Sequence, residues 1–204
     1  MTERLTMSQV STTTSSPRRR VAMTWVVWIT AVIAYGFAVM QRTSLGVMGL
    51  TAAAHFNAPA SVVATFMVLQ VAVYAVLQIP AGITVDRLGS RVVITAGSIV
   101  MTVGQVVMAL TGSVGGAVLA RVLVGCGDAF IFGAAIRLVP AWFPPKQTPL
   151  VTQLTGLLGQ FGQVVSAVGL VAMVNSSGWR STYLLAAGGA AVAAALAFLL
   201  IRDA

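Results

Sequence analysis

Residues 82–91 read Gly82-Ile83-Thr84-Val85-Asp86-Arg87-Leu88-Gly89-Ser90-Arg91 and lie between two long apolar runs, about 61–83 and 92–111. A helix needs about 20 mainly apolar residues to cross a bilayer, and each run is long enough to do so. The charged residues between the runs are stable only where water reaches them. This part of the sequence therefore predicts two membrane-spanning helices joined by a short, charged turn.

The composition of the whole chain agrees with a membrane protein. Of its 204 residues, 58% are hydrophobic and only 8% are charged, against about 25% charged residues in ordinary soluble domains. Residues 1–20 are rich in Ser and Thr and lack aromatic side chains, which is typical of a disordered cytoplasmic tail. The length rule marks six apolar segments, about 21–50, 61–83, 92–111, 114–139, 150–174 and 180–201. We expect an all-α membrane protein with six transmembrane helices over residues 21–204.

The basic residues indicate the orientation in the membrane. Cytoplasmic loops of membrane proteins carry an excess of Lys and Arg, and this chain has 12 such residues. With both termini in the cytoplasm, Arg180 falls in an outer loop and most of the others fall on the cytoplasmic side. The cytoplasmic set is Arg4, Arg18, Arg19, Arg20, Arg87, Arg91, Arg137, Lys146 and Arg202. We expect an integral inner (plasma) membrane protein with cytoplasmic termini.

Several classes of function are disfavoured by what the sequence contains. A net charge of +8 suggests nucleic-acid binding in a soluble protein, but the basic residues do not gather on one reading face. A single Cys126 and a single His55 provide neither a disulfide framework nor a metal-ligand cluster. The sequence has no nucleophile–base arrangement and no phosphate-binding loop. We expect no enzyme activity, no cofactor, no metal and no nucleic-acid partner.

Three charged residues, Arg42, Arg121 and Asp128, lie inside predicted spanning segments. A charge at the bilayer centre costs about 2.5–3.5 kcal/mol, so such a residue is a candidate functional residue. Arg121 and Asp128 share one helix face at i, i+7 but are too far apart to pair within their helix. Each therefore needs another partner. The structural alternative is that Arg42 extends to the outer interface while Arg121 and Asp128 pair with neighbouring helices.

Two uncharged polar stripes lie in other segments. Polar residues recur at four-residue steps in segment 61–83 and at steps of three and four in segment 150–174, so each set occupies one helix face. The stripes are Gln70, Tyr74 and Gln78, and Gln153, Gly156, Gln160 and Gln163. Amide side chains also hold transmembrane helices together, which is the structural alternative. Beside three intramembrane charges, the stripes favour a wet cavity lined by Tyr74, Gln78, Gln160 and Gln163.

The charged loop resembles the signature loop of the major facilitator superfamily, Gly-x-x-x-Asp-Arg/Lys-x-Gly followed by two basic positions. The matching residues are Gly82, Asp86, Arg87, Gly89 and Arg91, and Ser90 replaces the first basic residue. The resemblance implies a cytoplasmic gating loop in which Asp86 and Arg87 bond neighbouring helix ends and stabilise the outward-facing state. We expect Gly82 to permit close approach of two helices.

A second resemblance concerns the fourth segment. The stretch Arg121-Val122-Leu123-Val124-Gly125-Cys126-Gly127 resembles the superfamily's Arg-x-x-x-Gly-x-Gly motif. The resemblance implies one six-helix half, the N-terminal one, of a twelve-helix fold. Such halves are inverted three-helix repeats, and the solute site lies between two halves near the bilayer midplane. We therefore expect a second six-helix half as partner, from the same chain or from another.

Within the superfamily, the stretch Tyr74-Ala75-x-x-Gln78-Ile79-Pro80-Ala81-Gly82 and the pair Arg42 and Arg121 resemble the anion:cation symporter branch. That branch includes sugar-acid and vesicular glutamate transporters. The resemblance implies that Arg42 and Arg121 bind a solute carboxylate and that Asp128 carries the coupling proton. Gln41 departs from the pattern, because several proton-coupled members have an acid at this position.

The leading hypothesis is a secondary active transporter that moves a small organic anion by alternating access with proton coupling. A drug or metabolite exporter is the runner-up, although segment 150–174 lacks the Gly-Pro pair of drug/proton antiporters. A half-length membrane partner or remnant that transports nothing alone is the third alternative.

Overall fold

The chain is all-helical in the part that the structure describes. The computed structural model describes residues 17–203, with side chains from Val21 onward. Of the predicted tail, residues 1–20, the first sixteen lie outside the described residues. The first helix begins at Pro17, ahead of the predicted boundary at residue 21. The elements are α1 (Pro17–Val47), α2 (Gly49–His55), α3 (Ala60–Leu110), α4 (Val114–Trp142), α5 (Thr148–Val165), the π-helical turn η1 (Ser166–Leu170) and α6 (Val171–Leu200).

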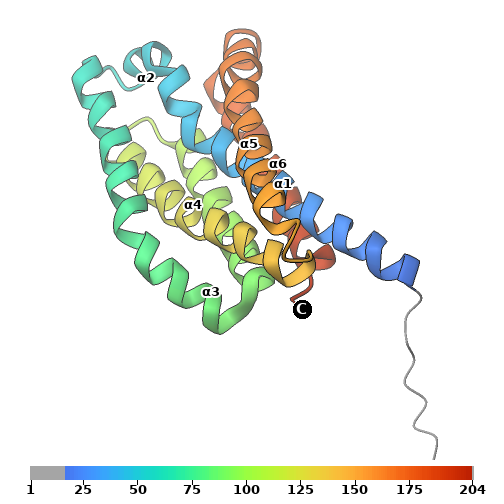
Figure 1. Cartoon of the computed structure of the whole chain (residues 1–204). Coiled ribbons are helices and arrows are strands. Elements are labelled where there is room, and N and C mark those ends of the chain that lie inside the picture. Colours follow the sequence, from blue (N-terminus) through green and yellow to red (C-terminus); the bar gives the residue numbers. More distant parts are fainter. Residues whose placement is uncertain (1–16, 204) are drawn as a thin grey trace, which may run out of the picture.

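Two of these helices reverse direction at a glycine. Helix α3 leaves helical geometry at Gly89, with φ 80° and ψ 162°, and α6 does so at Gly178, with φ 79° and ψ 173°. A positive φ is unfavourable for residues with a Cβ atom, so glycine permits both turns. Figure 1 shows the two arms of α3 running in opposite directions from the Gly89 turn. Gly89 lies between the predicted segments 61–83 and 92–111, and Gly178 lies between the predicted segments 150–174 and 180–201.

The first predicted segment, about 21–50, is divided in the structure. Helix α1 ends at Val47, and the short helix α2, which the sequence does not predict, carries the chain to His55. The His55 ring stacks on Trp179 with centroids 4.6 Å apart, and its Nε2 atom lies 3.1 Å from the carbonyl oxygen of Thr111. Helix α2 therefore packs at the end of the bundle where α3 ends and where α6 turns.

The exterior of the described bundle is suited to lipid. Four helical stretches are long and apolar enough to cross a membrane: Val21–Val47, Ala60–Leu110, Val114–Trp142 and Thr148–Leu200. Large apolar side chains such as Val76 and Ile79 are 73% and 77% exposed, and extended surfaces of this kind are unstable in water. The predicted count of six spanning helices is not confirmed, because two of the four stretches continue across a predicted turn.

Helix α4 packs closely against both arms of α3 because glycines remove side-chain bulk from the contacts. A Cβ atom on Gly125 would lie 2.6 Å from the carbonyl oxygen of Gln70 in the first arm. Gly127 meets Gly97 in the second arm, where a Cβ on Gly97 would lie 2.8 Å from the carbonyl oxygen of Gly127. Small residues at helix contacts are typical of membrane proteins. The two glycines of the Arg-x-x-x-Gly-x-Gly motif thus face two different helix arms.

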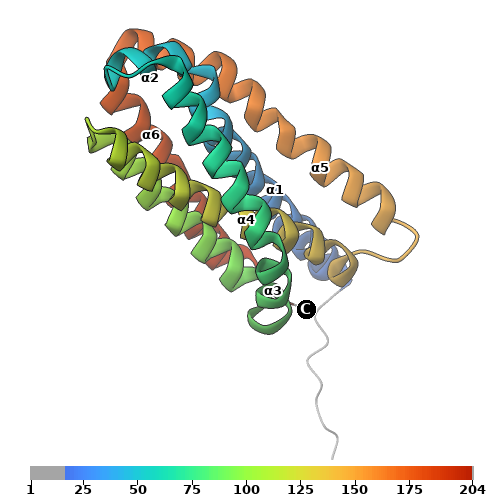
Figure 2. The same ribbon diagram turned by 90° about the vertical axis from the view of Figure 1, so that its left-hand side faces the viewer.

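Helix α1 packs against α5 and α6. Gly159 and Gly162 of α5 contact Tyr35 and Gly36 of α1, and any added Cβ atom would clash there. The part of α6 after Gly178 packs through small residues, and the following alanines are all buried: Ala186, Ala187, Ala190, Ala193, Ala194 and Ala197. Figure 2 shows α5 on the outside of the bundle, and Figure 1 shows α1 starting and α6 ending toward the end of the molecule that holds the Gly89 turn.

Candidate functional site

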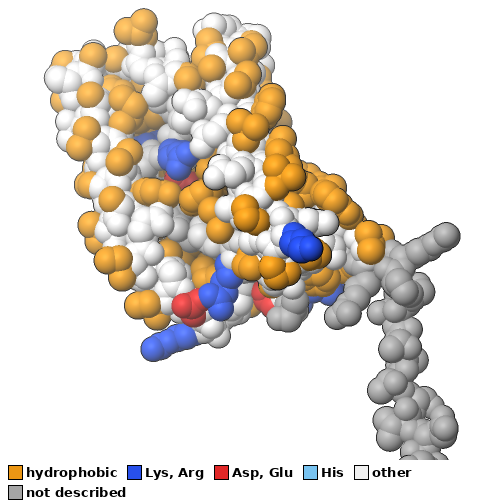
Figure 3. Space-filling view, viewed as in Figure 1, with side chains coloured by type: hydrophobic (Ala, Val, Ile, Leu, Met, Phe, Trp, Pro, Cys, Tyr) orange, Lys and Arg blue, Asp and Glu red, His pale blue; other side chains and the backbone are white. Residues whose placement is uncertain are grey.

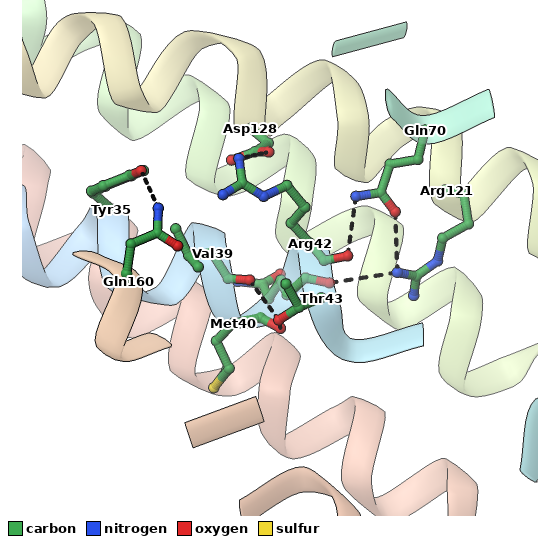
Figure 4. A network of polar contacts seen from close by, with 10 residues as sticks. Tyr35, Val39, Met40, Arg42, Thr43, Gln70, Arg121, Asp128 and Gln160 are labelled. Atoms are coloured by element: carbon green, nitrogen blue, oxygen red, sulfur yellow. Dashed lines mark hydrogen bonds and ion pairs between the residues drawn. The ribbon is translucent and has the colours of Figure 1, made fainter. Parts of the chain in front are cut away.

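An ion pair joins α1 to α4 inside the bundle. The Nη1 atom of Arg42 lies 3.2 Å from Oδ2 of Asp128, and Figure 4 shows the two side chains pointing toward each other. Asp128 is fully buried, whereas 25% of the Arg42 side chain is exposed. The other carboxylate oxygen, Oδ1, is buried and has no hydrogen-bond partner among residues 17–203. The pair therefore offers an accessible cation backed by a carboxylate with one free oxygen.

Aromatic and amide side chains surround Arg42. Its guanidinium carbon lies 5.7 Å from the ring centre of Tyr74 in α3, within range of a cation–π contact. The Nε2 atom of Gln160 in α5 donates a hydrogen bond of 3.3 Å to the hydroxyl of Tyr35 in α1, as Figure 4 shows. In Figure 3, basic and acidic side chains lie together in a hollow partway along the molecular face. Polar groups from α1, α3, α4 and α5 thus gather in one region.

Arg121 does not share the accessible position of Arg42. Its side chain is fully buried, with 0% exposed. Its guanidinium group donates hydrogen bonds to the carbonyl of Gln41 (3.5 Å), the hydroxyl of Ser44 (3.3 Å) and the amide oxygens of Gln70 and Gln105 (3.5 Å each). In this conformation the structure does not bring the two guanidinium groups to a common accessible surface, which a clamp on one carboxylate requires.

Gln70 connects the two arginines. Its Oε1 atom accepts from Arg121 at 3.5 Å, and its Nε2 atom donates to the backbone carbonyl of Arg42 at 3.3 Å. Gly125, one turn beyond Arg121, leaves room for the backbone of Gln70 against α4. Gln70 is itself 2% exposed, so it lies within the helix contacts and not on a cavity wall. Arg121 therefore contacts the turn of α1 that carries Arg42 both directly, at Gln41 and Ser44, and through Gln70.

The buried charges of this region do not cancel. Arg42 and Arg121 contribute two positive charges and Asp128 one negative charge, and Arg121 has no acidic partner in the part of the chain that the structure describes. Its positive charge is met by neutral carbonyl, hydroxyl and amide oxygens and by the ring of Tyr183, whose centre lies 5.8 Å from its guanidinium carbon. The net charge of the three residues is therefore +1, and a positive potential concentrates anions. The region is therefore electrostatically suited to an anion.

The predicted polar stripes are only partly brought to this region. Tyr74 and Gln78 are half-buried, and the Nε2 atom of Gln78 is buried with no hydrogen-bond partner among the described residues. Gln160 and Gln163 are exposed on α5, and only Gln160 has a contact with the region, through Tyr35. No group of three or more His, Cys, Asp or Glu residues that could hold a metal occurs among residues 17–203.

The charged loop contacts the end of α4 at the Gly89 end of the bundle. Asp86 forms an ion pair with Arg137 of α4, and both side chains are more than half exposed. Asp86 is thereby placed against the end of α4. For Arg87 the described part of the chain provides no ion-pair partner. Arg91 donates from Nε to the carbonyl oxygen of Phe198 at 2.7 Å.

Gly82 has no close helix contact within the described part of the chain. A Cβ atom added there would meet nothing within 4 Å, because Gly82 lies on the exposed side of the first arm of α3. Gly89 is the glycine of this loop that the structure requires, since it has a positive φ and lies against Asp203. The spacing of the motif does not distinguish these two glycines.

Sequence reasoning missed several polar residues of this region, namely Tyr35, Ser44 and Gln105. A lone Tyr, Ser or Gln in an apolar segment carries no periodic signal, and no stripe includes these residues. Their roles follow from helix packing, which brings them to Arg121 or Gln160. The requirement that a buried arginine must find acceptors predicts that such residues exist, but not which ones they are.

A family model described as the Major Facilitator Superfamily matches residues 26–204, nearly the whole of the described chain. The chain belongs to the Major Facilitator Superfamily. It is 24% identical over 159 residues to a probable L-galactonate transporter of Escherichia coli strain K12, covering 78% of this chain and 34% of that protein. It is 26% identical over 112 residues to a probable sulfoacetate transporter of Cupriavidus necator, covering 55% of this chain and 26% of that protein.

A solved structure has the same fold. A bacterial homologue of the human lysosomal transporter Spinster, in an inward-facing and occupied conformation, superposes with a TM-score of 0.77 at 18% identity. The superposition covers 93% of this chain and 46% of that one. The superfamily member described here thus spans about half the length of this structure and a smaller share of the two curated relatives. The family match and the four helical stretches that are long and apolar enough to cross a membrane make the chain an integral membrane protein of this superfamily.

Proposed function

We propose that this superfamily member moves a small organic anion across the membrane by alternating access, coupled to protons. The observation that carries the proposal is the Arg42–Asp128 pair, in which an accessible guanidinium group is held by a fully buried carboxylate. The names of the relatives, transporters of L-galactonate and of sulfoacetate, support a solute with an acidic group.

The pair offers a physical basis for anion binding. A solute carboxylate reaching Arg42 forms the same charge-assisted bonds that Asp128 forms, so solute and Asp128 compete for one guanidinium group. Tyr74 above that group and the Tyr35–Gln160 pair beside it supply hydrogen-bonding groups for the rest of the solute. In this proposal Arg42 contacts the solute, and Arg121 supports it through Gln70 and through its uncompensated charge.

The same competition couples solute binding to a proton. When the solute takes Arg42, Asp128 is left as a buried carboxylate without its partner, which is strongly destabilising. Uptake of a proton by Asp128 removes that penalty, and its free Oδ1 atom is available to hold the proton. A proton on Asp128 therefore favours solute on Arg42. This reciprocity is the thermodynamic requirement for coupled transport.

We further propose that the chain crosses the membrane six times and works with a second six-helix half. The reversals of α3 at Gly89 and of α6 at Gly178 divide the four long stretches into six passes. The basic residues Arg87, Arg91 and Arg137 support a cytoplasmic position for the Gly89 end, and hence for both termini. There the loop with Asp86 and Arg87 would act as the gate. The exposed apolar faces of α3 and α5 are available to the second half and to lipid.

The test is uptake of radiolabelled L-galactonate into vesicles that contain the protein. Arg42→Gln should abolish concentrative uptake while membrane insertion persists. Arg180→Gln is the matched control, because the Arg180 side chain is exposed and far along the chain from the site. Arg121→Gln should also reduce uptake, by loosening Gln70 and Arg42. Unchanged uptake in Arg42→Gln would defeat the assignment.

A further inference from the structure

The end of the described chain contacts the loop between the two arms of α3. The Oδ1 atom of Asp203 accepts hydrogen bonds from the backbone N–H groups of Ser90, at 2.7 Å, and of Arg91, at 3.3 Å. These amides open the second arm of α3, directly after the Gly89 turn. The first N–H groups of a helix have no acceptor within that helix. Asp203 therefore caps this arm with a side chain that is distant in the sequence.

Gly89 leaves the space for this cap. A Cβ atom on Gly89 would lie 2.5 Å from Oδ2 and 2.8 Å from Cγ of Asp203, too close for any real contact. The positive φ of Gly89 also turns the backbone so that the two following N–H groups face the carboxylate. The glycine of the charged loop thus serves both the turn and the approach of Asp203.

Other contacts hold the same terminal stretch in place. The guanidinium group of Arg91 lies 4.5 Å from the ring centre of Phe198, in addition to its bond to the Phe198 carbonyl. Trp142 at the end of α4 donates from Nε1 to the carbonyl oxygen of Arg202 at 3.0 Å. Ile201 is fully buried in a cluster with residues of α3 and α4. The ends of α4 and α6 and the α3 turn are therefore tied together.

We propose that Asp203 is a positioning residue of the gating loop. By capping the second arm of α3 it fixes where the turn ends and that arm begins, and so it sets Asp86 against Arg137. A carboxylate at a helix N-terminus is favourable both as an N-cap acceptor and toward the helix dipole. The effect of Asp203 on transport rests on the proposed function, whereas the capping hydrogen bonds do not.

The cap is tested by hydrogen–deuterium exchange of the protein in lipid nanodiscs, read by mass spectrometry on peptides covering residues 88–95. Asp203→Ala removes the acceptor and should speed exchange there about fivefold. Asp203→Asn keeps an acceptor and should exchange at about the wild-type rate. Arg202→Ala is the matched control, because its side chain is exposed and its carbonyl, which binds Trp142, is retained. Unchanged exchange in Asp203→Ala, or equal exchange in the Ala and Asn variants, overturns the cap.

The positioning role is tested by uptake of L-galactonate by the same variants. Asp203→Ala should lower the maximal rate severalfold and leave the half-saturating concentration unchanged, because the loop is remote from Arg42. Asp203→Asn should restore the rate. A maximal rate in Asp203→Ala equal to that of Arg202→Ala, despite faster exchange, overturns the role. If the wild type takes up no carboxylate, the proposed function fails, and the exchange experiment still decides the cap.

Discussion

Replacing Asp128 by Asn is the most informative single change, because it removes the negative charge of the central pair while preserving the shape of the side chain. In the wild type an anion must displace Asp128 from Arg42. In Asp128→Asn no carboxylate competes for that guanidinium group. We therefore expect the variant to bind carboxylates more tightly than the wild type at high pH and to lose the coupling between solute and proton.

The magnitude follows from the geometry of the pair. At the observed separation of 3.2 Å, two unit charges attract by about 5 kcal/mol at an effective dielectric constant of 20 and by about 1.3 kcal/mol in bulk water. Asp128 is buried and Arg42 is one-quarter exposed, so the attraction between the two charges lies between these two energies. The Asn amide oxygen retains about 1 kcal/mol of hydrogen bonding. The remaining difference therefore lies between about 0.3 and 4 kcal/mol, and its middle value of about 2 kcal/mol corresponds to roughly thirtyfold tighter binding.

The assay is isothermal titration calorimetry of the purified protein with L-galactonate at several pH values. Lowering the pH protonates Asp128 and frees Arg42, so the wild type should bind more tightly as the pH falls. The variant should show a nearly flat profile and should match the wild type at low pH, which serves as the internal control. Weaker binding by the variant at high pH, or a pH profile like that of the wild type, would refute the competition between solute and Asp128.

Other predictions concern stability and gating. Gly127→Ala, which inserts a Cβ atom against Gly97 and Met101, should destabilise the bundle by about 1–3 kcal/mol in a thermal unfolding assay. A Cβ atom at Gly133, on the same helix, meets nothing within 4 Å, so Gly133→Ala should leave the stability unchanged. Equal melting temperatures for Gly127→Ala and Gly133→Ala would contradict the packing of α4 on α3. Arg137→Gln should change the melting temperature little, because its ion pair with Asp86 is more than half exposed, yet it should alter the transport rate in vesicle uptake; the reverse pattern would argue against a gating loop. Trp28→Phe removes a buried 2.8 Å hydrogen bond to Thr155 and should cost about 1 kcal/mol of stability by chemical denaturation, and a neutral result would count against that bond.

Much of the fold follows from local sequence signals. The all-helical class, the apolar exterior and the turns near Gly89 and Gly178 are predictable, because chain length, charge and glycine act locally. The spacing of Arg121 and Asp128 predicts only that each needs a partner outside its own helical turn, and in the structure both have partners on α1, as the structural alternative has it. Helix α2 was not predicted, because seven residues carry too little periodicity to separate a short helix from a loop.

Less of the site than of the fold could be predicted from the sequence, because the site depends on packing between distant parts of the chain. Depth along a helix predicts that Arg42 and Arg121 lie inside the membrane, but it does not show which of the two reaches an accessible surface. That is decided by Gln70, Gln105 and Ser44, which surround Arg121. Gly82 and Gly89 have equal weight in the motif, and only the backbone angle distinguishes them. Asp203 gives no signal at all, because its partners are backbone amides more than a hundred residues away.

In the proposed mechanism one solute carboxylate and one proton bind interdependently at Arg42 and Asp128. The internal pH of vesicles that contain the protein, recorded when L-galactonate is added outside without an imposed pH gradient, reports whether the two enter together. We expect solute entry to acidify the lumen in the wild type, and we expect Asp128→Asn to admit solute without acidification. Entry of the carboxylate without any change of internal pH in the wild type would disprove the coupling.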